Sequence, residues 1–239
     1  MLTLYVNGDS HAAAAECVNT HAWACDDELY WGLGQRPHPD NERASFGCEM
    51  ANQLYAILEL DAQAGGSNAR IMRTTRAWIS QQTPEVLSNT FVVLQWSTWE
   101  RQEWLIDGEY IQINASGVDH VPESHQPQYR EFVANIDWSA CESQAHAEIH
   151  RFHLELQDQN IAHMMFNGNS HFESQPLYYN WHNCYMNPYD PGRTYDRVLK
   201  NNGFATVNPD SWHFGPDAHC FWGEYLLQYI NANNLLPTQ

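Results

Sequence analysis

Two short segments at opposite ends of the chain carry the residue types that a serine hydrolase combines. Gly8-Asp9-Ser10 follows an apolar N-terminal run, and Asp210-Ser211-Trp212-His213 lies near the C-terminus. A neutral hydroxyl is a poor nucleophile until an oriented imidazole takes its proton, so a serine, a histidine and a carboxylate must meet in one place. The two segments offer all three, in the chain order Ser, Asp, His.

Length and composition indicate a single domain, residues 1–239, with a buried core. The sequence has no break in composition, and hydrophobic residues make up 43% of it, with 10 Trp and 12 Tyr. The balance of 11 Lys and Arg against 29 Asp and Glu gives a formal charge of -18. That charge repels nucleic-acid phosphates and anionic membranes, so we expect neither as a partner.

The N-terminal run and the cysteines bear on the compartment. Residues 1–6 lack the basic n-region and long apolar stretch of a signal peptide, and no later stretch approaches the roughly 18 apolar residues of a transmembrane helix. We therefore expect a soluble chain without an export signal. Six scattered cysteines without a Cys-x-x-Cys pair favour free buried thiols, and Cys17 with Cys25 is the one pair close enough in sequence to consider as a disulfide.

The residues around Ser10 predict a strand-to-helix corner. Residues 2–6 read as a buried strand, and residues 7–10 as the turn that leaves it before an alanine-rich helix starting in 11–16. In an open α/β sheet the functional crevice lies outside the carboxyl ends of the strands. We therefore expect the Ser10 side chain to face ligand space.

Strands and helices alternate along the rest of the chain, which predicts a mainly parallel sheet. Further strands are expected at 91–96, 161–166 and 203–207, and a hairpin with an Asp-Gly turn at 104–113. Helical periodicity covers 49–60, 69–81, 128–159 and 218–230, and a long irregular excursion covers 26–45.

This arrangement of blocks resembles the SGNH, or GDSL-like, hydrolase family over almost the full length of the chain. In that family a Gly-Asp-Ser follows the first strand, and an Asp-x-x-His precedes the last helix. The resemblance implies Ser10 as nucleophile, His213 as general base and Asp210 as the carboxylate that orients the histidine. It also implies a three-layer α/β/α sandwich with a small, mainly parallel sheet in flavodoxin-like order, here with an inserted β-hairpin.

The second block of the family corresponds to the glycine turn at residues 65–68. Gly66 matches the glycine whose backbone N–H contributes to the oxyanion hole, and the N–H of Ser10 would be the second donor. Such donors matter because negative charge builds on the carbonyl oxygen in the transition state; removal of one typically costs ~10²–10³ in rate.

The third block departs from the family pattern. Where the family has Gly-x-Asn-Asp, this chain has Ser97-Thr98-Trp99-Glu100, so Trp99 replaces the asparagine that donates its side-chain amide. The indole N–H is a single donor on a much larger ring. Either Trp99, Thr98 or Asn68 supplies the missing donor, or the hole is weaker.

Two aromatic motifs, 95–101 and 212–216, resemble a divergent branch of the family associated with bacteriophage and marine-virus genomes. Because no export signal or transmembrane segment is expected, we predict a cytoplasmic or virion-associated protein; the resemblance implies association with a virion, with an oligomer as the other assembly to consider. It implies a small ester or an acylated carbohydrate as substrate, such as an acetylated host glycan, and no cofactor.

Several other side chains offer competing chemistry. Asp217 with His219 forms a second Asp-x-His pair, and Glu100 is an acid in the third block. A helix would place His146, His150 and His153 on one face, a spacing that can hold zinc, but without a neighbouring Glu in the order of a zinc protease we favour a solvated helix face and predict no metal site. Basic side chains on one predicted helix are expected to pair with carboxylates: Arg70, Arg73 and Arg76.

Three functions follow from these residues. We favour an esterase or acetylesterase that uses Ser10, His213 and Asp210, with Ser10 and Gly66 in the oxyanion hole. The alternative is a structural or glycan-binding protein of the same fold whose tryptophans, Trp96, Trp99 and Trp212, stack on sugar rings. The third is a metal-dependent enzyme built on the helix histidines.

Overall fold

The computed structural model describes residues 1–18, 37–115, 117 and 121–237 of the chain. At its centre is a sheet in the order β2-β1-β3-β6, in which every neighbouring pair of strands is parallel. The strands are β1 (Thr3–Asn7), β2 (Ile57–Leu60), β3 (Thr90–Trp96) and β6 (Ala162–Asn167). Their carboxyl ends therefore lie along one edge of the sheet, where the turn after β1 begins.

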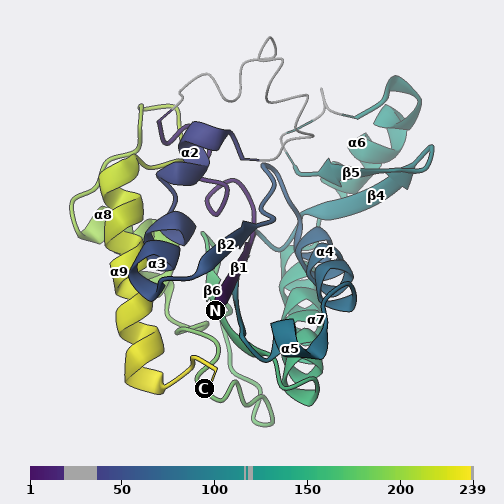
Figure 1. The fold of residues 1–239 in the computed structure, drawn as a ribbon. Helices are drawn as coiled ribbons and strands as arrows, with labels where there is room; N and C mark the ends of the chain where they lie inside the picture. The colour runs from purple at the N-terminus through teal and green to yellow at the C-terminus, as the bar shows by residue number, and fades with distance from the viewer. Residues whose placement is uncertain (19–36, 116, 118–120, 238–239) are drawn as a thin grey trace.

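Helices cover both faces of the sheet and make the three layers visible in Figure 1. One face packs against α3 (Phe46–Leu54), α8 (Tyr195–Asn201) and α9 (Pro216–Asn233). The other packs against α4 (Asn68–Ser80) and α7 (Trp138–Asp158). The fold is thus a three-layer α/β/α sandwich, as predicted.

Alternation of side chains along the strands explains the two cores. Leu4 and Val6 of β1 are fully buried in the core that includes Trp222 of α9, whereas Tyr5 lies in the core that includes Phe152 of α7. Every residue of β3 is buried, as expected for a central parallel strand that is covered on both faces.

The inserted hairpin is present as a separate two-stranded sheet. Strands β4 (Gln102–Ile106) and β5 (Glu109–Ile113) are antiparallel, and Figure 1 shows them projecting from the main sheet beside α6 (Gln126–Ala134). Ile113 and Tyr129 share a small core that joins the hairpin to α6. Four short elements complete the described chain: α2 (Pro39–Arg43), α5 (Pro84–Leu87) and 3₁₀ turns at Glu123–His125 and Pro191–Arg193.

Three local predictions were wrong. Residues 11–16 form consecutive turns, because Ala14 and Glu16 adopt positive φ angles of 50° and 59° that no helix accommodates. The segment 57–60, predicted as the end of a helix, is the edge strand β2. Residues 203–207 contribute only an isolated bridge between Thr206 and Phe214.

Two further predictions concern residues that the structure describes only in part. The irregular excursion at 26–45 falls largely outside the described residues, and its visible end contains α2. The five described cysteines are free thiols, as predicted, but only Cys17 is buried, so the predicted burial was wrong for the other four; Cys25 lies outside the described residues. Within the described chain, no helix is long and apolar enough to cross a bilayer.

Candidate functional site

The Gly8-Asp9-Ser10 turn is fixed by a buried side chain of the neighbouring strand. The amide oxygen of Gln95 on β3 accepts hydrogen bonds from the backbone N–H groups of Asp9 at 3.1 Å and Ala12 at 3.3 Å. A Cβ atom at Gly8 would lie 2.7 Å from the same oxygen, so the turn approaches β3 more closely than any side chain permits. Gln95 therefore positions the turn that presents Ser10.

Asp9 is a buried anchor, 2% exposed, and not a group facing solvent. Its carboxylate accepts hydrogen bonds from Ser97 Oγ at 2.7 Å, from Arg101 Nη1 at 3.1 Å and from the N–H of His11 at 3.0 Å. Burial acts to raise the pKa of Asp9, but the charges of His11 and Arg101 and these hydrogen bonds outweigh it, so the pKa is lowered. Ser97 of the divergent third block and Arg101 just after it thus hold the Gly8-Asp9-Ser10 turn in place.

Ser10 follows this anchor at the carboxyl edge of the sheet and is 6% exposed. Its backbone N–H has no hydrogen-bond acceptor among the described residues, although both Asp9 and His11 donate theirs. A free N–H beside a serine hydroxyl is the arrangement that an oxyanion hole requires.

The imidazole of His213 is held by a glutamate from the turn that follows Ser10. Nδ1 of His213 lies 2.6 Å from Oε2 of Glu16, and the Ser211 hydroxyl donates to the same oxygen at 2.6 Å. Burial acts to raise the pKa of Glu16, but the hydrogen bonds from His213 and Ser211 and the attraction to His213 outweigh it, so the pKa is lowered. A carboxylate at Nδ1 fixes the tautomer whose Nε2 carries the lone pair that a general base needs.

Asp210, the carboxylate expected at this position, lies elsewhere in the structure. Its side chain is exposed in the loop before α9, and its backbone N–H donates to Asn208 Oδ1 at 3.0 Å. The Asp-x-x-His spacing therefore brings His213 to the site while the carboxylate beside Nδ1 comes from Glu16.

Ser10 and His213 come from opposite ends of the chain to the same edge of the fold. The ring of His11, the residue after Ser10, lies 5.4 Å from the ring of His213 between centroids. Among the described residues the Ser10 hydroxyl makes no hydrogen bond to His213. Catalytic hydrogen bonds of this kind are often long without substrate and tighten when it binds.

The expected oxyanion donors other than Ser10 are engaged in structural hydrogen bonds. The N–H of Gly66 donates to the carbonyl of Gln63 at 2.9 Å. The side-chain amide of Asn68 holds the backbone of Ser97, with Oδ1 accepting from its N–H at 2.8 Å and Nδ2 donating to its carbonyl at 3.4 Å.

The indole N–H of Trp99 is also engaged in a structural hydrogen bond. Its indole Nε1 donates to the carbonyl of His171 at 3.3 Å, and its ring stacks on Phe172 at 4.5 Å between centroids. The segment after β6 brings a different amide to the site, since Asn169 Nδ2 lies 3.1 Å from Nε2 of His11. The Asn-Gly-Asn that follows the predicted strand at 161–166 was the sequence signal for this residue.

The other two tryptophans predicted to stack on sugar rings, Trp96 and Trp212, have opposite environments. Trp96 is fully buried, edge-on to Phe152 at 6.3 Å, so its ring offers no face to a ligand. Trp212 is 68% exposed directly before His213, and Lys200 Nζ lies 5.6 Å from its ring centroid. Trp212 is therefore the one of the pair that a ligand can reach.

The structure also shows the surroundings of the residues that offered alternatives to His213 and Asp210 in the sequence. His219 is 1% exposed in the core, where Nδ1 accepts from the N–H of Phe46 at 3.2 Å, and burial lowers its pKa to about 3. Glu100 is buried and accepts from the hydroxyl of Thr98 at 3.0 Å. Asp217 is exposed in the first turn of α9.

The predictions for the arginines of α4 and for the histidines of α7 had different outcomes. Each predicted arginine of α4 pairs with a carboxylate, as expected: Arg70 with Asp61, Arg73 with Glu103 and Arg76 with Glu155. The prediction of a solvated histidine face on α7 was wrong. His146 is 6% exposed and stacks on Phe172 at 4.0 Å, and His153 is fully buried, because the segment after β6 packs aromatic rings over this helix.

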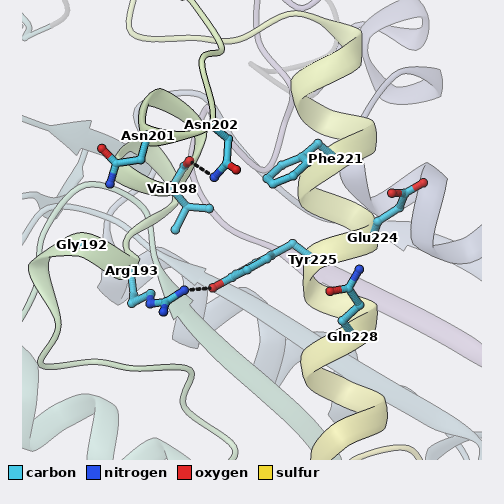
Figure 2. A pocket seen from close by; sticks show the side chains of 9 residues that line it. All are labelled: Gly192, Arg193, Val198, Asn201, Asn202, Phe221, Glu224, Tyr225 and Gln228. Atoms are coloured by element: carbon cyan, nitrogen blue, oxygen red, sulfur yellow. Dashed lines mark hydrogen bonds between the residues drawn. The ribbon is translucent and has the colours of Figure 1, made fainter.

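A pocket between α8 and α9, shown in Figure 2, lies apart from these residues. Its volume is about 540 Å³, and the side chains that line it include Val198, Phe221 and Tyr225, whose hydroxyl accepts from Arg193 Nη1 at 2.9 Å. None of Ser10, Glu16 and His213 lines it, so it is not where the predicted chemistry would take place.

Comparisons with known proteins found distant likenesses among solved structures. No family model and no curated protein matches the chain. The structure is similar to an acetyl xylan esterase (Est2A) from the rumen bacterium Butyrivibrio proteoclasticus, with 13% identity over 98% of this chain and a TM-score of 0.45; the match covers 64% of that chain, less than two thirds of it.

Two further structures match over almost their whole length. A psychrotrophic esterase (EstA) from Pseudoalteromonas sp. is 10% identical over 97% of this chain and 98% of its own, with a TM-score of 0.47. A phospholipase A1 from Streptomyces albidoflavus is 11% identical over 98% of this chain and 100% of its own, with a TM-score of 0.45. These likenesses are too distant to assign an activity, which has to come from the residues of the site.

Proposed function

We propose that this chain is a serine hydrolase that cleaves carboxylic esters with Ser10 as nucleophile and His213 as general base. The observation that carries the proposal is the pair formed by His213 and Glu16 beside the Ser10 turn, with Nδ1 and Oε2 2.6 Å apart. An imidazole whose Nδ1 donates to a carboxylate is oriented so that its Nε2 can take and return a proton, as a general base does.

In the proposed reaction, Ser10 Oγ attacks the ester carbonyl carbon while Nε2 of His213 takes the hydroxyl proton. The oxyanion that forms accepts a hydrogen bond from the free N–H of Ser10. Collapse of this intermediate breaks the bond to the alcohol, which leaves with the proton from His213. Water then attacks the acyl-enzyme by the same route, with His213 again taking and returning the proton, and the carboxylic acid is released.

Glu16 is the residue that we assign to the orienting role, with Asp210 as the alternative carboxylate. Glu16 accepts a hydrogen bond from Nδ1 of His213 directly and is itself positioned by Ser211. Its lowered pKa keeps it ionised at neutral pH, so it stabilises the imidazolium that forms when His213 accepts the serine proton.

For the second oxyanion donor we assign Asn169. Its Nδ2 lies 3.1 Å from Nε2 of His11 at the carboxyl end of β6, and its NH₂ group keeps a second N–H to donate. The backbone N–H of Gly66 and the indole N–H of Trp99 are single donors spent on backbone carbonyls, and both ends of the buried Asn68 amide hold Ser97. A side-chain amide there would replace the asparagine that the third block lacks.

The substrate class that we propose is an acylated carbohydrate. The exposed ring of Trp212 precedes His213, so a sugar ring stacked on it would bring an attached ester toward the imidazole. Association with a bacteriophage particle stays a prediction from the sequence motifs.

Labelling by a fluorophosphonate probe tests the nucleophile. The wild-type protein and a Ser80→Ala control, altered at an exposed serine of α4, should both be labelled, and Ser10→Ala should not. Hydrolysis of p-nitrophenyl acetate should fall by roughly 10³ or more in both Ser10→Ala and His213→Ala. Equal labelling of wild type and Ser10→Ala would overturn the proposal.

The exposed Trp212 also suits the non-catalytic alternative, a glycan-binding protein. That function predicts no ester turnover by the wild type, together with retention on an immobilised glycan that is lost in Trp212→Ala and kept in Ser10→Ala. Turnover that depends on both Ser10 and His213 excludes it.

A further inference from the structure

A cluster of two histidines and a cysteine lies at the opposite end of β6 from the Ser10 turn. His153 comes from α7, His163 from the start of β6, and Cys184 from the segment that follows this strand. Their ligating atoms all lie within 4.8 Å of one another. His153 is fully buried, His163 is 3% exposed and Cys184 is partly buried.

The hydrogen bonds of the two rings define where their protons lie. Nδ1 of His163 is 2.7 Å from the carbonyl of Ile161, and a carbonyl can only accept, so Nδ1 carries the proton and Nε2 carries a lone pair. That lone pair faces Nδ1 of His153 at 2.8 Å. If the two rings share a proton, it must belong to Nδ1 of His153.

Such a proton leaves the other side of His153 unsatisfied. Its Nε2 would then be a bare acceptor, and this atom is buried without a hydrogen-bond partner among the described residues. The backbone carbonyl of Asn180 lies close enough to favour a proton on the His153 ring, although it is not placed for a hydrogen bond to Nε2. An unpaired buried lone pair facing a carbonyl is costly.

A cation held by both rings removes the need for a proton between Nδ1 of His153 and Nε2 of His163. Both ring nitrogens then direct lone pairs at the metal, His153 keeps its proton on Nε2, and the Ile161 carbonyl orients His163 as a backbone acceptor does behind many metal-binding histidines.

The third ligand is fixed in place by the backbone. His182 and Asn183 adopt positive φ angles of 46° and 62°, which turn the chain back toward the sheet before Cys184. The carbonyl of Cys184 accepts from the N–H of Met165 on β6 at 2.6 Å. A bound cation would favour the thiolate form of Cys184.

We propose that His153, His163 and Cys184 form a zinc site that fastens the segment after β6 to α7 and to the sheet. Two imidazoles and a thiolate suit Zn²⁺, which takes four ligands in a tetrahedral arrangement. The exposed ring of His182, 6.2 Å from that of His153 between centroids, or a water molecule completes the set. The site lies at the amino end of β6, so its role is to stabilise the fold and not to take part in ester cleavage.

A second group of possible ligands provides a matched control. This group consists of Glu49, Cys220 and Glu224, whose ligand atoms also lie within 4.8 Å of one another. Two of the three residues are exposed, and the group contains no buried histidine. Exposed acidic groups of this kind are common without a metal, so Cys220→Ser removes an equivalent thiol without touching the proposed site.

Titration of untagged, chelator-treated protein with Zn²⁺ and with Co²⁺ tests the proposal. We expect wild type and Cys220→Ser to bind one metal per chain, to show a thiolate-to-cobalt charge-transfer band and to gain in Tm with zinc. Cys184→Ser should lack the band and bind zinc at least about tenfold more weakly. Far-ultraviolet circular dichroism checks that Cys184→Ser is folded. If this variant is not folded, the titration of the wild type alone decides whether the zinc site exists.

Three results would overturn the zinc site. These are a wild-type chain that takes up less than one metal at micromolar zinc, a cobalt spectrum without the charge-transfer band, and a band that disappears in Cys220→Ser but persists in Cys184→Ser. None of these measurements uses ester hydrolysis, so the zinc site and the proposed function can fail independently.

Discussion

Replacement of Glu16 by glutamine tests the assignment of the orienting carboxylate. Oε2 of Glu16 accepts from His213 Nδ1 and from Ser211 Oγ, each at 2.6 Å, and a carboxylate presents acceptors only, whereas a glutamine side chain also carries an NH₂ donor. In Glu16→Gln the amide can turn its NH₂ toward Nδ1 and stabilise the wrong tautomer of His213. The charge that balances the imidazolium is lost as well.

The expected loss follows from the burial of the pair. A fully buried triad aspartate replaced by asparagine costs about 10⁴ in kcat. The side chains of His213 and Glu16 retain 12% and 14% exposure, so water can substitute in part for the carboxylate. We therefore expect a fall of roughly 10³ in kcat, about 4 kcal/mol in activation free energy, with KM nearly unchanged because Glu16 contacts His213 on its Nδ1 side, opposite the Nε2 that would face the substrate.

Steady-state hydrolysis of p-nitrophenyl acetate measures this loss, with Asp210→Asn as the matched control. The control should keep kcat within about twofold of wild type, because Asp210 is exposed. A large loss in Asp210→Asn with normal activity in Glu16→Gln would refute the assignment and return the role to Asp210. Normal activity in both variants would refute the view that a carboxylate orients His213.

Two further predictions concern stability. Gly8→Ala places a Cβ atom 2.7 Å from Gln95 Oε1 and should lower the free energy of unfolding by about 2 kcal/mol or more. In the control Gly215→Ala no atom lies within 4 Å of the new Cβ, so its urea midpoint should stay close to that of the wild type. Equal midpoints for the two variants would contradict the close approach of Gly8 to Gln95. Burial lowers the pKa of His11 to about 4 and that of His219 to about 3 from 6.5, so the unfolded state binds more protons in mild acid and stability falls as the pH drops below 6.5. Linkage gives a loss of about 1.3 kcal/mol per histidine between roughly pH 7.5 and 5.5, and urea denaturation at those two values checks it; an unchanged midpoint would show that these rings can be charged in the fold.

The sheet could be predicted from the sequence because its strands are marked by unbroken apolar runs. Residues 91–96 and 161–166 read as buried strands, and the structure has β3 and β6 there. The edge strand β2 was missed because its burial alternates, and Ile57-Leu58-Glu59-Leu60 continues the apolar pattern of the helix before it. Edge strands are decided by pairing with a distant segment, here β1, and not by local preference.

The candidate site could be predicted from the sequence where it depends on the position of a residue along the chain, and not where it depends on turn geometry. Ser10 follows β1 and His213 precedes α9, as the spacing of the blocks indicated. Glu16 was missed because an alanine-rich run predicts a helix, and only the positive φ angles of Ala14 and Glu16 fold the chain back toward His213. Gln95 had a signal that was not used, since it is the polar residue within an apolar buried strand.

The altered third block now has a physical explanation in the way Asp9 is held. Ser97 and Arg101 donate to the Asp9 carboxylate, and Asn68 in turn fixes the backbone of Ser97. These residues stabilise the turn that presents Ser10 and leave no amide free for an oxyanion. A hydrolase with this block therefore needs its second donor from another strand, and Asn169 at the carboxyl end of β6 is the amide that the fold brings to the same edge.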